Sequence, residues 1–432
     1  MISLKRLSIG IYLVCASALF APHVQAQEVL KMMQYNLMYY TQTSGVSECN
    51  STTNNLDQKD ANIRKIFHYV MPDVFCVCEM GTNISYVERL LNNAINTDGV
   101  NYYQHGPLTS YSGGQIANMI YYDSRKLRYH SLIAISTAYR DINGYKMYYN
   151  STELAHGDTI FITFWIMHLK AGSGETNASA RLAQTQKLMS KLSSLGGPGN
   201  HVVSGDFNVY GSEEPAYQEM TQYSNSLYRL YDPIGRDGHW NNNSSFRDIH
   251  TQSTHYESDG CFATGGLDDR FDIILVSPYV YYGVNGVMVK PETYHALGQD
   301  GNRYNSSIIS PTNTLIPTDV ANALYNQSDH LPVITEFSIA AHVGVANLDS
   351  EFYLQVTNPV QDDRLSIRMQ VAQEGDYCFE VFSMDGKLTK TFTLHLDAGA
   401  HQLSEPFDLA HGMYLLKVSD GKHRPQIQKL VK

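Results

Sequence analysis

The stretch from Val29 to about Phe337 alternates apolar, strand-like runs with amphipathic, helix-like runs, and this alternation restricts the possible fold more than any other feature. Mixed strands and helices at this density predict an α/β domain in which helices cover the sheets. The strands are expected at Leu30–Met38, Val74–Cys78, Asn118–Tyr122, Ile160–His168, Val202–Gly205, Phe271–Ser277 and Val333–Phe337. The helices are expected at Asp60–Val70, Tyr86–Ala94 and Ala180–Leu195.

The run Val202–Gly205 continues into Asp206-Phe207-Asn208, so a carboxylate and an amide follow the end of a predicted strand. Side chains two residues apart in an extended chain point the same way, which would place Asp206 and Asn208 on one face. A proton-handling carboxylate beside a neutral donor and acceptor suits the hydrolysis of a phosphate ester. A strand that runs into an Asp/Asn turn has the same letters, so the segment alone indicates a turn as much as a site.

Polar groups with the same chemistry stand at the ends of other predicted strands. Singly, each is explained as a solvated strand end or an ordinary loop. Jointly, carboxylates, an amide, an imidazole and an ammonium in one α/β domain are what a divalent-cation phosphoesterase needs. Hard oxygen ligands suit Mg²⁺ or Mn²⁺. The groups are Asn36, Glu79, His168 with Lys170, Asp272 after Asp268-Asp269-Arg270, and Ser328-Asp329-His330.

This ordered set of motifs resembles the endonuclease/exonuclease/phosphatase superfamily over about residues 28–340. The motifs are Tyr35-Asn36, Cys78-Glu79, His168-Leu169-Lys170, Gly205-Asp206-Phe207-Asn208, Arg270-Phe271-Asp272 and Ser328-Asp329-His330. The resemblance implies a four-layer α/β sandwich, with two mixed sheets face to face and helices outside. It also implies a Mg²⁺-type active site at one edge, with Mn²⁺ or Ca²⁺ as alternatives.

The resemblance assigns roles to individual residues. Glu79 would be the principal metal ligand, with Asn36 beside it and Asp329 at or near the metal. His330, oriented by Asp272, would act as general base or polarise the attacking water. Asp206 would position or transfer a proton, Asn208 and His168 would stabilise charge on phosphoryl oxygens, and Lys170 and Arg270 would bind substrate. Water would attack phosphorus in line, without a covalent enzyme intermediate.

Both ends of the chain indicate export. Lys5 and Arg6 precede the apolar stretch Ile9–Phe20, and Val24-Gln25-Ala26 is a small-residue cleavage site, so residues 1–26 are predicted to be a secretory signal peptide. Cys15 has poor lipobox surroundings, which leaves a lipoprotein as the minor alternative. No later segment is apolar enough to span a membrane. The protein is therefore expected to be secreted or to reside on the cell surface.

Residues 351–432 change in character after a linker at 341–350. Short alternating strands separated by turns predict a small all-β sandwich. This region resembles the sorting domain of the bacterial type IX secretion route, which implies that the secretion machinery is a partner; a generic β-sandwich binding module is the alternative. The resembling segments are Thr357-Asn358-Pro359-Val360, Asp385-Gly386-Lys387, Leu409–Tyr414 and Lys429–Lys432.

Five cysteines follow the signal segment, and their spacing matches neither a zinc site nor the usual redox pair. Cys76 and Cys78 are interpreted as small hydrophobes on one face of a buried strand. Export permits a disulfide, for example between Cys49 and Cys261, but the sequence alone does not pair the cysteines.

Charge and loop composition leave the substrate open. The 432 residues carry a net charge of −11, and their one tight cationic cluster is Arg125, Lys126 and Arg128. An acidic protein is not built for tight, sequence-independent binding of nucleic acid, although a nuclease can hold a short backbone segment through metal and local contacts. Long loops are expected at Trp240–Leu267 and Gly283–Gln327, with substrate recognition or a structural role at His239-Trp240 and Phe246-Arg247-Asp248.

The leading hypothesis is therefore an exported, metal-dependent phosphodiester hydrolase, with extracellular nucleic acid as its expected substrate. A lipid or sugar phosphoesterase, such as a sphingomyelinase-like or inositol-phosphate phosphatase-like enzyme, is the second hypothesis. A non-enzymatic surface protein is the third. The sequence does not indicate the oligomeric state.

Overall fold

The computed structural model describes residues 28–41, 49–151, 159–195, 197–258, 260–339, 352–357, 360, 363–371, 373–422 and 425–432. The expected signal peptide (1–26), Cys15 and the linker (341–350) lie outside the described residues, as do Asn358 and Pro359 of the C-terminal motif. The boundaries expected at residues 27, 340 and 351 therefore stay predictions.

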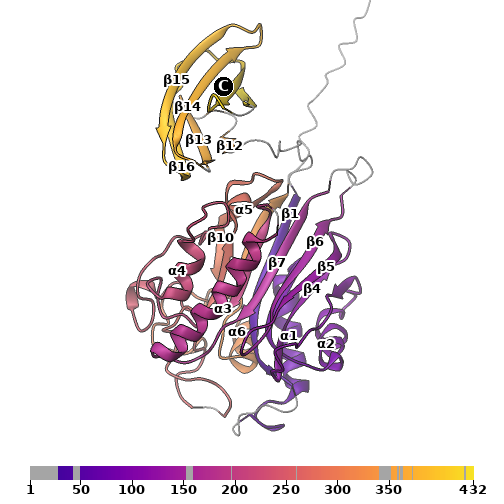
Figure 1. Cartoon of the computed structure of the whole chain (residues 1–432). Helices are drawn as coiled ribbons and strands as arrows, with labels where there is room; N and C mark the ends of the chain where they lie inside the picture. Colours follow the sequence, from indigo (N-terminus) through magenta and orange to yellow (C-terminus); the bar gives the residue numbers. More distant parts are fainter. Residues whose placement is uncertain are drawn as a thin grey trace, which may run out of the picture.

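Two mixed sheets form the larger part of the molecule (Figure 1). In each sheet a parallel pair occupies the interior, β1–β2 in the first and β7–β8 in the second, and the other pairings are antiparallel. The first sheet has the order β10-β11-β1-β2-β4-β3, from Val287–Ala296, Val333–Ile339, Glu28–Tyr40, Val74–Gly81, Ile116–Asp123 and Tyr103–His105. The second has the order β5-β6-β7-β8-β9, from Leu127–Ile135, Ile142–Tyr149, Phe161–His168, His201–Asp206 and Asp272–Val276.

The two sheets pack face to face, and helices cover their outer faces. One apolar core, which includes Met32, Phe164 and Ile274, lies between the sheets. A second core joins the first sheet to α1 (Leu56–Val70), α2 (Ile84–Leu90) and α6 (Thr318–Gln327), and a third joins the second sheet to α3 (Glu175–Ser193) and α4 (Pro215–Thr221). The predicted four-layer α/β sandwich is confirmed.

The central strands match their sequence pattern closely. Every residue of β2, β4, β8 and β9 is buried, because a strand inside such a sandwich has a core on both faces. The predicted helix at Tyr86–Ala94 is α2 followed by a single π-helical turn, η1 (Leu91–Ile95). The expected loop Trp240–Leu267 has one short 3₁₀ turn, η3 (Ser244–Phe246).

The expectation of one long loop at Gly283–Gln327 is wrong. This segment contains the edge strand β10 and the helix α6. Strand β10 carries Pro291 and several exposed residues, because its outer edge has no neighbour in the sheet. Its sequence therefore has the polar, proline-containing pattern of a loop.

The cysteines have two different roles. Cys49 and Cys261 form a disulfide, the pairing that the sequence permitted without requiring. Cys76 and Cys78 are free and fully buried in the core between the sheets, as predicted for small hydrophobes. The disulfide ties the segment after β1 to the long loop that precedes β9.

The C-terminal region is all-β, as predicted. A three-stranded sheet, β12-β13-β16, and a four-stranded sheet, β15-β14-β17-β18, enclose an apolar core of their own. Gln370 hydrogen-bonds to Tyr231 and to the carbonyl of Ser226, near α5 (Pro278–Tyr282) at one end of the α/β sandwich. The strands are Phe352–Val356, Arg364–Val371, Gly375–Ser383, Leu388–Leu396, Gly399–Pro406, Met413–Ser419 and Gln426–Val431. Within the described residues, no helix is both long and apolar enough to cross a membrane.

Candidate active site

The polar strand ends meet at one end of the sandwich. His168 is the last residue of β7 and pairs in register with Asp206, the last residue of β8. Asp206 in turn pairs with Asp272, the first residue of the antiparallel strand β9. The structure brings together seven predicted residues from both sheets: Asn36, Glu79, His168, Asp206, Asp272, Asp329 and His330.

Left-handed backbone conformations mark these strand ends. Met38, Tyr39, Glu79 and Asn208 all have a φ between 47° and 61°, although none is glycine. The pairing of β1 with β2 shifts register in the same region, between Asn36 and Tyr40. Each such residue costs about 1–3 kcal/mol and persists only where neighbouring contacts enforce it, as at functional sites. Here the backbone N–H of Tyr39 donates to Glu79 Oε2 at 2.8 Å, and this hydrogen bond fixes the position of the Glu79 carboxylate.

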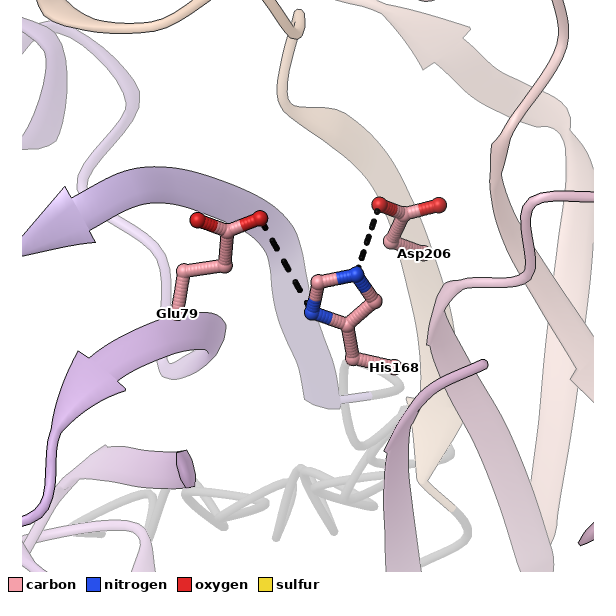
Figure 2. Close-up of side chains that lie close together, drawn as sticks. All are labelled: Glu79, His168 and Asp206. Carbon is pink, nitrogen blue, oxygen red and sulfur yellow. Dashed lines mark ion pairs between the residues drawn. The ribbon is translucent and has the colours of Figure 1, made fainter. Parts of the chain in front are cut away.

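Glu79, His168 and Asp206 form a buried group that could hold a metal ion (Figure 2). The His168 ring lies between the two carboxylates, with Nδ1 3.8 Å from Glu79 Oε1 and Nε2 3.4 Å from Asp206 Oδ2. Burial lowers the pKa of His168 well below its ordinary value, and the charges of Arg140 and His330 lower it further. The ring is therefore neutral at neutral pH and offers a lone pair.

Burial raises the pKa of Asp206 to about 7, and the nearby carboxylates of Asp272 and Glu79 add to the rise. Asp206 Oδ1 accepts the backbone N–H of Asn208 at 3.1 Å. The expectation that the Asp206 and Asn208 side chains share one face of an extended strand is wrong. Strand β8 ends at Asp206, and Asn208 is left-handed, with its amide Nδ2 directed to the Leu169 carbonyl.

Asn36 lies beside both carboxylates. Its Nδ2 donates to Glu79 Oε1 at 3.1 Å and to Asp206 Oδ2 at 3.0 Å, while its Oδ1 accepts Met38 N–H. In this arrangement the Asn36 amide group bridges Glu79 and Asp206 through its NH₂. Its oxygen faces the backbone, whereas metal ligation by Asn36, as the resemblance implies, would need this oxygen to face the carboxylates.

His330 and Asp272 form a second buried pair. His330 Nδ1 lies 2.6 Å from Asp272 Oδ2, and Nε2 faces Asp206 Oδ2 at 3.8 Å. Burial by itself lowers the pKa of His330, but the carboxylates of Asp272 and Asp206 outweigh burial and raise it well above the ordinary value. The two distances fix the orientation of the ring, because one nitrogen is held by Asp272 and the other is directed to the metal-binding group.

Sequence reasoning missed Gln252, which lies in the long loop before β9. Its Nε2 is 2.8 Å from His330 Nε2 and 3.3 Å from Asp329 Oδ2. The backbone N–H of Ala263 also donates to Asp329 Oδ2, at 3.0 Å. Asp329 is thus held by this loop, while Glu79, His168 and Asp206 form the group of potential ligands. No pattern around Gln252 indicates this role.

The donor set fits a divalent cation. His168 Nδ1, Asp329 Oδ1 and Asp272 Oδ1 are buried here without a hydrogen-bond partner, although such atoms are normally paired. Glu79 and Asp206 supply the oxygen ligands that Mg²⁺, Mn²⁺ and Ca²⁺ prefer. A neutral imidazole between them suits Mn²⁺ at least as well as Mg²⁺.

The two predicted substrate-binding cations differ in their placement. The Arg270 guanidinium is buried and paired with Asp232 at 2.6 Å, so its role in substrate binding stays a prediction. Lys170 lies just past β7, with its Nζ on the Ala171 carbonyl. Arg140, which the sequence did not single out, donates from Nη1 to the carbonyls of His168 and Leu169.

Two other polar motifs of the sequence lie outside the seven-residue group. Trp240 is fully buried, and its ring packs against the Arg270 guanidinium. The cationic cluster of the sequence lies at the opposite end of the sandwich, where Arg125 binds Asp123 and Lys126 binds Asp73.

Comparisons with known proteins find similarity in overall fold only. No family model and no curated protein matches the sequence. Among solved structures, a humanized D. rerio TDP2 is 14% identical, covers 72% of this chain and 99% of its own, and has a TM-score of 0.42. The human Nocturnin catalytic domain with bound sulfate is 14% identical, with 73% and 98% coverage and a TM-score of 0.43. A mannosyl-6-phosphatase from Bacteroides thetaiotaomicron is 14% identical, with 72% and 100% coverage and a TM-score of 0.42. At these identities and TM-scores, the activity of this chain has to be inferred from its own side chains.

Proposed function

We propose that this chain is an exported, divalent-metal-dependent phosphodiester hydrolase that acts on extracellular nucleic acid. The observation that carries the proposal is the contact between two buried groups. The Glu79–His168–Asp206 group could hold a cation, and His330, fixed by Asp272, directs Nε2 to Asp206 Oδ2 at 3.8 Å. A proton acceptor beside a cation site is the arrangement that hydrolysis of a phosphate ester requires.

The chain's own residues suggest how water attacks phosphorus. Asp272 accepts the Nδ1–H of His330, and a cation held by Glu79 and Asp206 would offset the carboxylate charge that raises the pKa of the ring, so that Nε2 could take a proton from the attacking water. Gln252 and Asn36 lie 2.8 and 3.5 Å from that nitrogen, so they define the space in which the water must sit. A cation held by Glu79, Asp206 and His168 would neutralise charge on the phosphoryl oxygens.

A non-enzymatic role does not account for this site. Seven polar residues are buried together, and three of their atoms have no partner in the described structure. Burying unpaired polar atoms costs several kcal/mol, which stability alone gives no reason to retain. A lipid or sugar phosphoesterase would use the same groups, so a substrate panel has to separate these classes.

The test uses the full chain with Mg²⁺, Mn²⁺ or Ca²⁺ and compares DNA, RNA, sphingomyelin, inositol phosphates and a bis-aryl phosphodiester. We expect hydrolysis of the bis-aryl diester and of nucleic acid, and loss of most activity with chelator, Glu79→Gln or His330→Ala. Glu336→Gln is the matched control, because Glu336 on β11 pairs with Lys290 on the neighbouring edge strand β10, outside the cluster. Full turnover in chelator, or by the His330 variant, would exclude this mechanism.

We propose further that the C-terminal sandwich is a sorting domain of the type IX route and that the protein is released or held at the cell surface. The C-terminal sandwich has an apolar core of its own, which supports a role separate from that of the α/β sandwich. Deleting residues 341–432 should abolish export while the purified remainder keeps phosphodiesterase activity. Normal export of the truncated chain would contradict the sorting role, and loss of activity would contradict the separation of the two parts.

A further inference from the structure

Three turns lie at the catalytic end of the sandwich, next to His168. The turn between β5 and β6 lies there because Ile135 pairs with Ile142, at the same end of the sheet as the last residue of β7. The loop before β4 lies there because Ile116 pairs with Gly81, two residues after Glu79. The loop after β7 starts at Leu169. These turns carry Tyr111, Tyr139, Arg140 and Lys170, which we call the rim.

Hydrogen bonds lock the rim turns to one another. The carboxylate of Asp141 accepts the backbone N–H groups of Tyr111 and Ser112, at 2.7 and 2.8 Å. Thr137 Oγ1 accepts the N–H groups of Tyr139 and Arg140. The backbone that presents the rim side chains is therefore fixed before any ligand arrives, which lowers the entropic cost of binding.

The rim places positive charge beside the cation-binding group. Arg140 Nη1 donates to the His168 and Leu169 carbonyls at 3.4 and 3.1 Å, while the half-buried guanidinium keeps further N–H donors. Lys170 Nζ lies 5.8 Å from the centre of the Tyr139 ring, which adds a second cation at the same edge.

The rim also exposes aromatic rings. Tyr111 is 73% exposed and Tyr139 is 38% exposed, whereas most tyrosines of the α/β sandwich are buried or half-buried. Exposed rings interleaved with cations are the combination that binds single-stranded nucleic acid, because bases stack on the rings and phosphates meet the cations. Bases inside a duplex have no free face for such stacking.

We propose that the rim of Tyr111, Tyr139, Arg140 and Lys170 binds an unpaired nucleic-acid strand next to the phosphate that is cut. The proposal rests on the phosphodiesterase function and deepens it by naming single-stranded nucleic acid as the substrate class. The strand would cross the rim with its bases on the two rings and its backbone toward Arg140. Single-stranded or melted segments would then bind more tightly than a duplex.

Binding without turnover tests the rim directly. A fluorescein-labelled 12-nucleotide single strand and a hairpin duplex of equal length are titrated with the full-length His330→Ala protein, and anisotropy is followed between 50 and 200 mM salt. Tyr139→Ala and Tyr111→Ala should each weaken single-strand binding by about tenfold with an unchanged salt slope. Arg140→Ala and Lys170→Ala should each reduce the slope of log Kd against log salt by about 0.7.

Matched controls keep the result interpretable. Tyr69→Ala and Arg128→Ala remove an exposed ring and an exposed cation at the far end of the sandwich, and we expect both to bind like the parent. Tyr139→Phe keeps the ring and should restore binding, which separates stacking from a folding defect. Tighter binding of the hairpin, or equal weakening by the far-end variants, would overturn the proposal.

Two further outcomes separate this proposal from the proposed function. If the unmodified protein hydrolyses the bis-aryl diester but rim variants bind oligonucleotide like the parent, the rim proposal fails and the phosphodiesterase stands. If oligonucleotide binding depends on the rim but no phosphodiester is hydrolysed, the proposed function fails. Binding to anionic phosphatidylglycerol vesicles that is lost with Tyr111→Ala, without oligonucleotide binding, would assign the rim to a membrane surface instead.

Discussion

Replacing Asp272 with asparagine removes a buried negative charge but leaves an oxygen that can still face His330. Both side chains are at most 5% exposed, so water does not replace a lost contact. Asp272 Oδ1 has no hydrogen-bond partner, so an amide at this position is free to present either atom to the ring. The variant should therefore keep the His330 tautomer and lose only the charged part of the hydrogen bond.

The size of the effect follows from that difference. A hydrogen bond to a charged group contributes about 1.5–3 kcal/mol, against about 1 kcal/mol for a neutral one. If the difference of about 0.5–2 kcal/mol is lost in the transition state, kcat falls by about 2- to 30-fold. Asp272→Ala also removes the group that orients the ring, so kcat should fall by about 10²–10⁴-fold, the usual contribution of a general base.

Hydrolysis of the bis-aryl diester at saturating Mn²⁺ gives kcat, and calorimetry gives the metal affinity. We expect the Mn²⁺ affinity to change by less than about threefold, because Asp272 is outside the Glu79–His168–Asp206 group. Asp123→Asn is the matched control, since Asp123 is a buried carboxylate paired with Arg125 at the opposite end. A folded, metal-binding Asp272→Ala protein with kcat within threefold of the parent would refute the assignment of His330 as base.

Three further predictions concern the metal ligands and the disulfide. In the metal-free protein the pKa of Asp206 is raised to about 7, so between about pH 4 and 7 the folded chain keeps a proton that an unfolded carboxyl has released. The free energy of unfolding of the metal-free protein should therefore fall as pH rises through this window. Because Mn²⁺ displaces the proton, it should raise Tm more at pH 8 than at pH 5.5. Equal Tm shifts at the two pH values would contradict ligation by Asp206. His168→Ala should raise the Kd for Mn²⁺ at least about tenfold by calorimetry, whereas an unchanged Kd with a lower kcat would assign His168 to the phosphate. Joint replacement of Cys49 and Cys261 by serine opens a link across 212 residues and should cost about 2–5 kcal/mol in denaturant unfolding, while Cys378→Ser should cost almost nothing.

The interior strands could be predicted because each has a core on both faces. Strands such as β2 and β9 are short, continuous apolar runs, and no surface pattern interrupts them. The outer strands differ, since β5 mixes exposed and half-buried residues and β10 carries Pro291. A sequence pattern does not separate such strands from loops, because half of each strand faces water.

The buried half of the site could be predicted for a related reason. Glu79, His168 and Asp272 stand at or next to the ends of apolar strands, and ends of neighbouring strands converge at one edge of a sheet. Gln252 and Arg140 could not be predicted, because turn geometry and hydrogen bonds between loops decide where they lie. The left-handed backbone conformation of Glu79 could not be predicted either, because glutamate has no local preference for that conformation.

Net charge also has a different meaning once the chain is folded. The net charge of −11 argues against tight, sequence-independent binding of nucleic acid. The one dense cationic cluster in the sequence is paired with carboxylates at the end of the sandwich opposite the site. Charges more than about 8 Å apart are largely screened at physiological salt, so a bound strand responds to the groups beside it rather than to the sum. Arg140 and Lys170 come from separate turns that the sheet registers bring to one edge, so their combined field is a property of the fold. The slope of log Kd against log salt reports the number of phosphate contacts that the protein makes. A slope that falls in the Arg140 and Lys170 variants would therefore support strand binding at the rim, even though the whole chain is acidic.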